Sequence, residues 1–253
     1  MRRWWRRVRA ALAVALAGLA AVGAGGHQFS SSAATPATPD PHLVAQGRRL
    51  YLDGCSSCHG GDARGIRDRG PSLRGAGEVA ADFYLRTGRM PLENPSDEPV
   101  RRSQTFYSNA QIRALVAYVG SFGGPRIPSV APVQGDLGRG KELFTEHCAG
   151  CHQVMGRGGI VPKAVVPALT HSEPIDVAEA VEVGPYVMPK FTTLTREDVN
   201  DLARYVEQAK HPDNRGGLGL GNIGPVPEGA VTFLVGMAAL LLGIRIIGER
   251  TTE

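Results

Sequence analysis

Apolar residues recur every three or four positions in two segments of the chain. The positions are Ile112, Leu115, Val116 and Val119 in the first segment, and Val199, Leu202, Ala203 and Val206 in the second. This spacing places each set on one face of a helix, whereas the alternation that is typical of strands is scarce. The pattern predicts a mainly α-helical protein with amphipathic helices over residues 110–120 and 197–207.

Two continuous apolar runs lie near the ends of the chain. Residues 10–26 carry no charge and follow an arginine-rich start, which predicts a signal peptide or an N-terminal membrane anchor over residues 1–26. Residues 229–248 hold a single charge, Arg245, and are long enough to cross a hydrocarbon core of about 30 Å. They predict a C-terminal transmembrane helix. Arginines at the outer end of each run place both ends in the cytoplasm and the middle of the chain outside.

The two helical segments belong to an internal repeat. The matched landmarks are Gly47 with Gly140, Tyr51 with Phe144, Pro71 with Pro167, and Met90 with Met188. Each copy reads as a short helix, a cysteine pair, a long loop, a Met-Pro step and the amphipathic helix. One module is therefore used twice.

The repeat and the apolar runs divide the chain into seven parts. Between the leader (1–26) and the transmembrane helix (229–248), we expect a disordered spacer (27–41), a first domain (42–122), a linker (123–135), a second domain (136–211) and a Gly/Pro-rich linker (212–228). The prolines of the 123–135 linker favour a semi-extended conformation.

Composition and charge exclude several classes of protein. With 42% hydrophobic and 21% charged residues, the 253-residue chain is expected to fold. The net charge is +4, but it becomes −1 without the five leader arginines, so nucleic-acid binding is not expected. Asp53, Glu146 and the other scattered acids form no pair suited to acid–base catalysis and are expected to be solvated. Aromatic residues make up only 6%, so a bulky cofactor could complete each small core.

The four cysteines form two Cys-x-x-Cys-His motifs. They comprise Cys55, Cys58 and His59 in the first module and Cys148, Cys151 and His152 in the second. This motif is the attachment signature of c-type haem, in which the two thiols form thioethers and the histidine binds the iron. A zinc site would need further ligands at a complementary spacing. A thioredoxin-like dithiol would need neither the histidine nor the repeated context. The motifs therefore predict two covalently bound haem c groups.

The residue on the other side of each iron separates an electron carrier from an enzyme. Met90 and Met188 each precede a proline and the last helix of their module, and a thioether there raises the reduction potential. Either methionine could instead fill a gap in the core. His171 is a rival ligand in the second module but has no counterpart in the first, and Met155 lies too close to His152 to reach the far side.

Further residues are expected around the haems. The carbonyls of Pro71 and Pro167 are candidates to accept the second N–H of each iron-binding imidazole, a contact that fixes the orientation of the ring. Six residues are candidates to pack on the porphyrins: Tyr51, Leu73, Tyr118, Phe144, Leu169 and Tyr205.

These features together resemble the dihaem cytochrome c subunit of actinobacterial-type cytochrome bc1 complexes. The resemblance rests on the two motifs, on residues 67–73, 75–78 and 87–91, and on the glycine-rich stretch 217–229 before the apolar helix. Residues 158–174 and 185–187 depart from the family's pattern. The resemblance implies two tandem class I cytochrome c-like domains, with the axial and attachment residues named above.

The family also implies a function and partners. Its subunit works with cytochrome b and a Rieske iron–sulfur protein in a quinol–cytochrome c reductase of the aerobic respiratory chain. One haem accepts an electron from the Rieske cluster, and the other passes it to an aa3-type oxidase. The expected location is the cell membrane, with the haem domains on the extracytoplasmic side.

Two other functions stay open at this point. A dihaem subunit of another oxidase or dehydrogenase would be expected to have an N-terminal anchor and no helix at 229–248. A dihaem peroxidase would need one iron with an open coordination position, which two Met-Pro steps disfavour.

Overall fold

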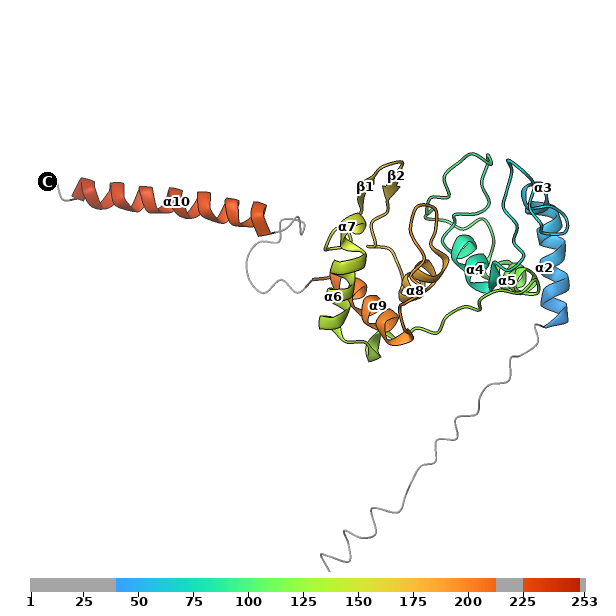
Figure 1. Ribbon diagram of the computed structural model, residues 1–253. Coiled ribbons are helices and arrows are strands. Elements are labelled where there is room, and N and C mark those ends of the chain that lie inside the picture. The colour runs from blue at the N-terminus through green and yellow to red at the C-terminus, as the bar shows by residue number, and fades with distance from the viewer. Residues whose placement is uncertain (1–39, 213–224, 251–253) are drawn as a thin grey trace, which may run out of the picture. The chain divides into compact units, whose positions relative to one another are not determined.

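The computed structural model describes residues 40–212 and 225–250 (Figure 1). The leader predicted over residues 1–26, the spacer up to residue 39 and residues 213–224 of the last linker lie outside the described residues. In the described part the fold is mainly helical, as predicted.

Each module folds around two helices that pack against each other. In lobe 1 (residues 41–122), α2 (Pro41–Gly54) packs on α5 (Asn109–Gly120). In lobe 2 (residues 132–210), α6 (Leu137–His147) packs on α9 (Arg196–Lys210). The helices α5 and α9 both begin with a capping box, and their apolar faces form the two cores.

A glycine allows the close approach of the two helices in each lobe. A Cβ on Gly47 would lie 1.9 Å from the carbonyl oxygen of Ala114, and one on Gly140 would lie 2.1 Å from that of Asp201. These contacts involve backbone atoms, so only a shift of a whole helix could relieve them. The aromatic pairs beside the glycines also correspond, with ring centroids 5.2 Å apart for Tyr51 and Tyr118 in lobe 1.

Replacement of Gly47 by alanine is therefore expected to destabilise lobe 1 by about 2 kcal/mol or more, because overpacking forces the helices apart. Gly61→Ala is the matched control, since its Cβ would meet nothing within 4 Å. Thermal melting of the haem-loaded full chain measures both variants. Equal melting temperatures for the two variants would contradict the close packing of α2 on α5.

Each cysteine motif forms a single helical turn, α3 (Ser56–His59) or α7 (Ala149–His152). The long loops contain elements that the sequence pattern did not predict, beginning with a further helix in each loop, α4 (Gly77–Arg86) or α8 (Pro174–Val183). Lobe 2 also has a 3-10 turn, η1 (Pro132–Gln134), and a small antiparallel hairpin. In the hairpin, β1 (Gly159–Val161) pairs with β2 (Ala164–Val166), and Ile160 lies opposite Val165.

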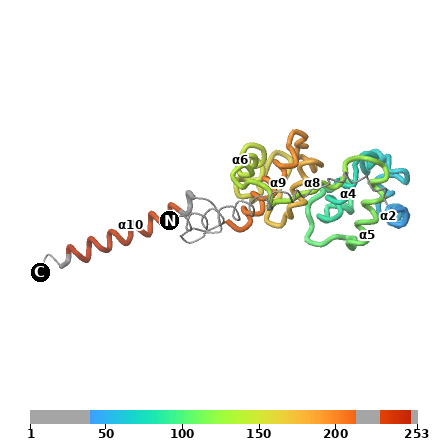
Figure 2. The backbone as a smooth tube through the Cα atoms, turned by 90° about the horizontal axis from the view of Figure 1, so that it is seen from below, coloured from blue at the N-terminus to red at the C-terminus, as the bar shows by residue number. Residues whose placement is uncertain are grey.

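The helices α4 and α8 pack against each other and join the two lobes. They lie side by side in both views of the chain (Figures 1 and 2). The unpredicted helices thus form the contact between the modules.

The last described helix, α10 (Pro225–Arg250), contains the predicted span. Its residues Gly229–Gly248 have a mean hydropathy of 2.3 and are not buried against other parts of the structure. Its large side chains are mostly exposed, with Leu234 at 66% and Leu241 at 61%. Among the described residues, it is the one helix whose length and composition suit a membrane span.

Candidate functional site

The two cysteine motifs form the same backbone turn. In lobe 1 the backbone N–H of His59 donates to the carbonyl of Cys55 at 2.9 Å, and in lobe 2 that of His152 donates to Cys148, also at 2.9 Å. Each cysteine motif directly follows the first long helix of its lobe. One helical turn therefore brings two thiols and an imidazole together in each lobe.

A proline carbonyl lies beside each of these imidazoles. Nδ1 of His59 is 2.8 Å from the carbonyl oxygen of Pro71, and Nδ1 of His152 is 3.1 Å from that of Pro167. A carbonyl only accepts hydrogen bonds, so Nδ1 carries the proton and Nε2 keeps its lone pair. Burial also lowers the pKa of His152, although the Pro167 carbonyl opposes this. Both rings are thus oriented with Nε2 available as a metal ligand.

The thiols of these motifs lack the properties of a redox dithiol. All four cysteines are free, and burial raises the pKa of both Cys55 and Cys148 to about 11. Reactive dithiols have lowered pKa values, because the thiolate is the nucleophile. In addition, no group of three His, Cys, Asp or Glu side chains in the described residues is arranged to hold a metal ion by itself. The motifs fit neither a thiol-redox centre nor a zinc site.

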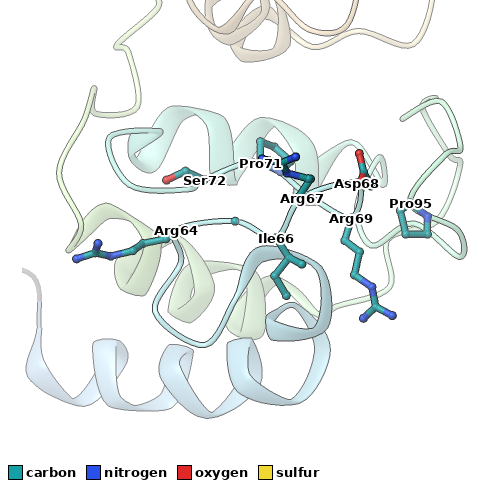
Figure 3. A pocket seen from close by; sticks show the side chains of 10 residues that line it. Arg64, Ile66, Arg67, Asp68, Arg69, Pro71, Ser72 and Pro95 are labelled. Carbon is teal, nitrogen blue, oxygen red and sulfur yellow. The ribbon is translucent and has the colours of Figure 1, made fainter.

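Next to Pro71, lobe 1 has an open depression of about 590 Å³ (Figure 3). It is lined by residues 64–72 and by Pro95, which follows Met90 by five positions. The depression thus separates the loop that contacts His59 from the loop that follows Met90. Arg64, Arg67 and Arg69 give its lining a basic character.

The two predicted axial methionines lie in different surroundings. Met90 is half-buried and packs against the core of lobe 1. Met188 is also half-buried, in the loop before α9, where its backbone N–H donates to the carbonyl of Pro185 at 3.0 Å. In lobe 2 it is Met155 that packs against the core. His171, the rival ligand, is exposed in a turn.

Arg89, for which the sequence pattern predicts no role, is a buried cation next to Met90. Arg89 is 8% exposed, and its guanidinium lies 4.6 Å from the ring centroid of Phe83. Burial lowers the pKa of this guanidinium. Its Nη1 is buried and has no hydrogen-bond partner among the described residues. A buried guanidinium nitrogen without a hydrogen-bond partner favours a carboxylate. The only sequence signal was its place directly before Met90.

The six residues predicted to pack on the porphyrins belong to the two cores. Tyr51, Leu73 and Tyr118 lie in or against the core of lobe 1, and Phe144, Leu169 and Tyr205 occupy the same places in lobe 2. The phenol of Tyr51 donates to the carbonyl of Gly60, 2.6 Å away and directly after His59. Each core is therefore continuous with its cysteine motif.

One expectation about the acids was wrong. Asp176 and Glu179 were expected to be solvated with the other scattered acids, but they are only 3% and 0% exposed. Both lie on α8, where they face arginines of lobe 1. Contact between the lobes explains their burial, and a pattern within one helix does not reveal such a contact.

The residues present suit a c-type haem in each lobe. A haem has two vinyl groups for the paired thiols, an iron for Nε2 of the histidine, and propionate carboxylates that would satisfy a buried guanidinium such as that of Arg89. The cysteine motif turn and the histidine–proline contact occur in both lobes, whereas the position of Arg89 is occupied by Val187 in lobe 2.

Two protein-family models match the chain, one in each lobe. The family described as cytochrome c matches residues 44–122, and the family described as cytochrome c oxidase, cbb3-type, subunit III, matches residues 135–206. Each lobe is thus a cytochrome c domain, and such domains bind haem c covalently. The chain therefore carries two covalently bound haem c groups.

Curated relatives match both lobes together. The cytochrome bc1 complex cytochrome c subunit of Corynebacterium diphtheriae is 36% identical over 239 residues, which cover 86% of this chain and 85% of the relative. The subunit of the same name from Mycobacterium tuberculosis is 37% identical over 83% of this chain and 79% of the relative.

Among solved structures, reduced recombinant cytochrome c4 from Pseudomonas stutzeri matches at 21% identity and a TM-score of 0.25, over 65% of this chain and 97% of that one. The family assignment rests on the sequence relatives, which are similar over most of their length. The chain belongs to the family of cytochrome c subunits of the cytochrome bc1 complex.

Proposed function

We propose that the haems are attached through Cys55 and Cys58 in lobe 1 and through Cys148 and Cys151 in lobe 2. His59 and His152 bind the irons through Nε2, and Met90 and Met188 bind on the opposite sides. A haem supplies a one-electron redox centre, because its iron alternates between the ferrous and ferric states. The observation that carries this assignment is the repeated contact between the histidine Nδ1 and a proline carbonyl, at 2.8 and 3.1 Å.

The surrounding residues adjust each redox centre. The carbonyls of Pro71 and Pro167 hold the imidazoles in one tautomer and make them better donors to iron. The thioethers of Met90 and Met188 raise the reduction potentials. Arg89, whose buried Nη1 has no hydrogen-bond partner among the described residues, would hold a propionate of the first haem.

The subunit acts as an electron relay in a quinol–cytochrome c reductase. One haem accepts electrons from the Rieske iron–sulfur protein, which works with cytochrome b, and the other passes them to an aa3-type oxidase. The exposed apolar surface of α10 supports a membrane anchor, with the haem lobes on the extracytoplasmic side. The chain itself carries out no bond chemistry.

Purification of the membrane complex in mild detergent tests this relay. Cytochrome b, a Rieske protein and aa3-type oxidase subunits are expected to copurify, and the complex should oxidise quinol with oxygen without added soluble cytochrome c. A complex that requires added cytochrome c for this reaction would contradict direct transfer to the oxidase. Absence of the Rieske protein and cytochrome b would contradict the assignment to the reductase.

A further inference from the structure

The contact between the lobes contains a buried network of carboxyl groups centred on one arginine. Arg86 of α4 lies 2.8 Å from Asp82 of its own helix, 2.6 Å from Asp176 and 2.6 Å from Glu179. The last two residues belong to α8 of lobe 2. A single guanidinium from lobe 1 thus binds two buried carboxyl groups of lobe 2, and the exposed carboxylate of Glu173 lies 4.0 Å away.

A second arginine strengthens the same contact. Arg101 of lobe 1 lies 2.8 Å from the other carboxylate oxygen of Asp176, so that carboxylate is held by two guanidiniums. Burial alone would raise the pKa of Asp176, but these two arginines and the backbone N–H of Glu173 lower it below its usual value. Lobe 1 therefore supplies the cations and lobe 2 the ionised anion.

Because these side chains are buried, their contacts contribute more to the stability of the contact between the lobes than exposed pairs do. The side chain of Asp176 is 4% exposed, that of Glu179 is 0% exposed and that of Arg86 is 25% exposed. Exposed pairs on these lobes, such as that between Arg64 and Asp62 at 73% and 59%, contribute little because water screens them. Removing one partner of a buried pair leaves an uncompensated charge and is strongly unfavourable.

We propose that Arg86 is a positioning residue that locks lobe 2 onto lobe 1 and so fixes the two haem sites relative to each other. This inference rests on the proposed electron relay, because a fixed separation between the haems is what transfer within one chain requires. Arg86 contacts the neighbouring lobe at α8, and it is not part of either cysteine motif.

Glu179 differs from Asp176 in the direction of its pKa shift. Burial, together with the nearby carboxylate of Asp82, raises its pKa to about 9, so it is protonated at neutral pH. Its Oε1 is buried and has no hydrogen-bond partner among the described residues, whereas its Oε2 lies 2.6 Å from Nη2 of Arg86. Glu179→Gln keeps a neutral side chain and is expected to leave the lock intact, whereas Asp176→Asn removes an ionised partner and should release it.

The test measures the distance between the lobes in the haem-loaded full chain. Gadolinium spin labels are attached at Gln46→Cys on α2 and Lys141→Cys on α6, both exposed positions, and the distance distribution is measured by pulsed EPR with both haems reduced. The parent protein should give one narrow distribution. Arg86→Gln is expected to weaken docking of the lobes roughly 100-fold or more and to broaden the distribution.

Three further variants show whether a change in the distance distribution results from loss of the contacts of Arg86. Arg64→Gln is the matched control and should keep the narrow distribution, while Asp176→Asn should reproduce the effect of Arg86→Gln from the other lobe. The exchange Arg86→Glu with Glu179→Arg restores one guanidinium among three carboxylates and should narrow the distribution again. Unchanged haem absorption spectra in these variants would show that each lobe still folds.

The proposal is overturned if Arg86→Gln gives the same distribution as Arg64→Gln, or if the exchange gives no narrowing. The electron relay has its own readout, the rate of electron equilibration between the two haems after rapid photoreduction. Arg86→Gln should slow this rate at least tenfold relative to Arg64→Gln. If equilibration is absent in the parent protein while its distance distribution is narrow, the relay fails and the lock stands.

Discussion

Replacing Met90 by alanine is expected to open the sixth coordination position of the haem in lobe 1. Loss of the thioether should lower the reduction potential of that haem by on the order of 0.2 V, within the range of roughly 0.8 V that axial ligands control. The ferrous variant should also bind carbon monoxide stoichiometrically. Met188→Ala should have the same two effects on the haem of lobe 2. Redox titration followed by optical spectroscopy measures both.

A matched methionine variant separates ligation from packing. Met155 packs against the core of lobe 2, so Met155→Ala should lower the melting temperature without changing either potential or creating a carbon monoxide site. If Met188→Ala leaves the potential unchanged and His171→Ala shifts it, the ligand of the second iron is His171. Stoichiometric uptake of carbon monoxide by the parent protein would instead favour a peroxidase.

Replacing Cys148 and Cys151 together by serine is expected to leave a chain with one covalent haem. Serine cannot form the thioethers, and without haem the small core of lobe 2 loses the group around which it packs. The pyridine haemochrome absorbance per chain should fall to about half. The double serine variant at Cys55 and Cys58 should lose the haem of lobe 1 instead. Its haemochrome absorbance per chain should also be about half that of the parent protein.

Gly150→Ala is the control for this experiment. Gly150 lies between the two cysteines, and a Cβ there would meet nothing within 4 Å, so both haems should be retained. A double serine variant that still carries two covalent haems would show that these thiols are not the attachment points.

The sequence predicted the parts of the fold that depend on local pattern. The amphipathic helices α5 and α9 follow from their apolar spacing, and the repeat follows from the alignment of the two cysteine motifs, which also pairs Gly47 with Gly140. The contacts of His59 with Pro71 and of His152 with Pro167 were also anticipated. These features could be predicted because they follow from the spacing of apolar residues and from the recurrence of the same landmarks in both modules.

The contact between the lobes could not be predicted in this way. On α8, Asp176 and Glu179 occupy buried positions, so the helix lacks the separation of apolar and polar faces that a pattern detects. Their burial depends on Arg86, about 90 residues earlier in the chain. Similarly, nothing in the sequence signals that Arg89 is buried, because its environment is set by how α4 and the Met90 loop pack.

The central claim is that each lobe of this chain is built around a covalently attached haem. Intact-mass spectrometry of the purified full chain, expressed with haem-attachment machinery, tests it most directly. A mass increase equal to two haems that survives denaturation and acid–acetone extraction is the predicted result. A chain that carries one haem, or that releases its haem under these conditions, would contradict the claim.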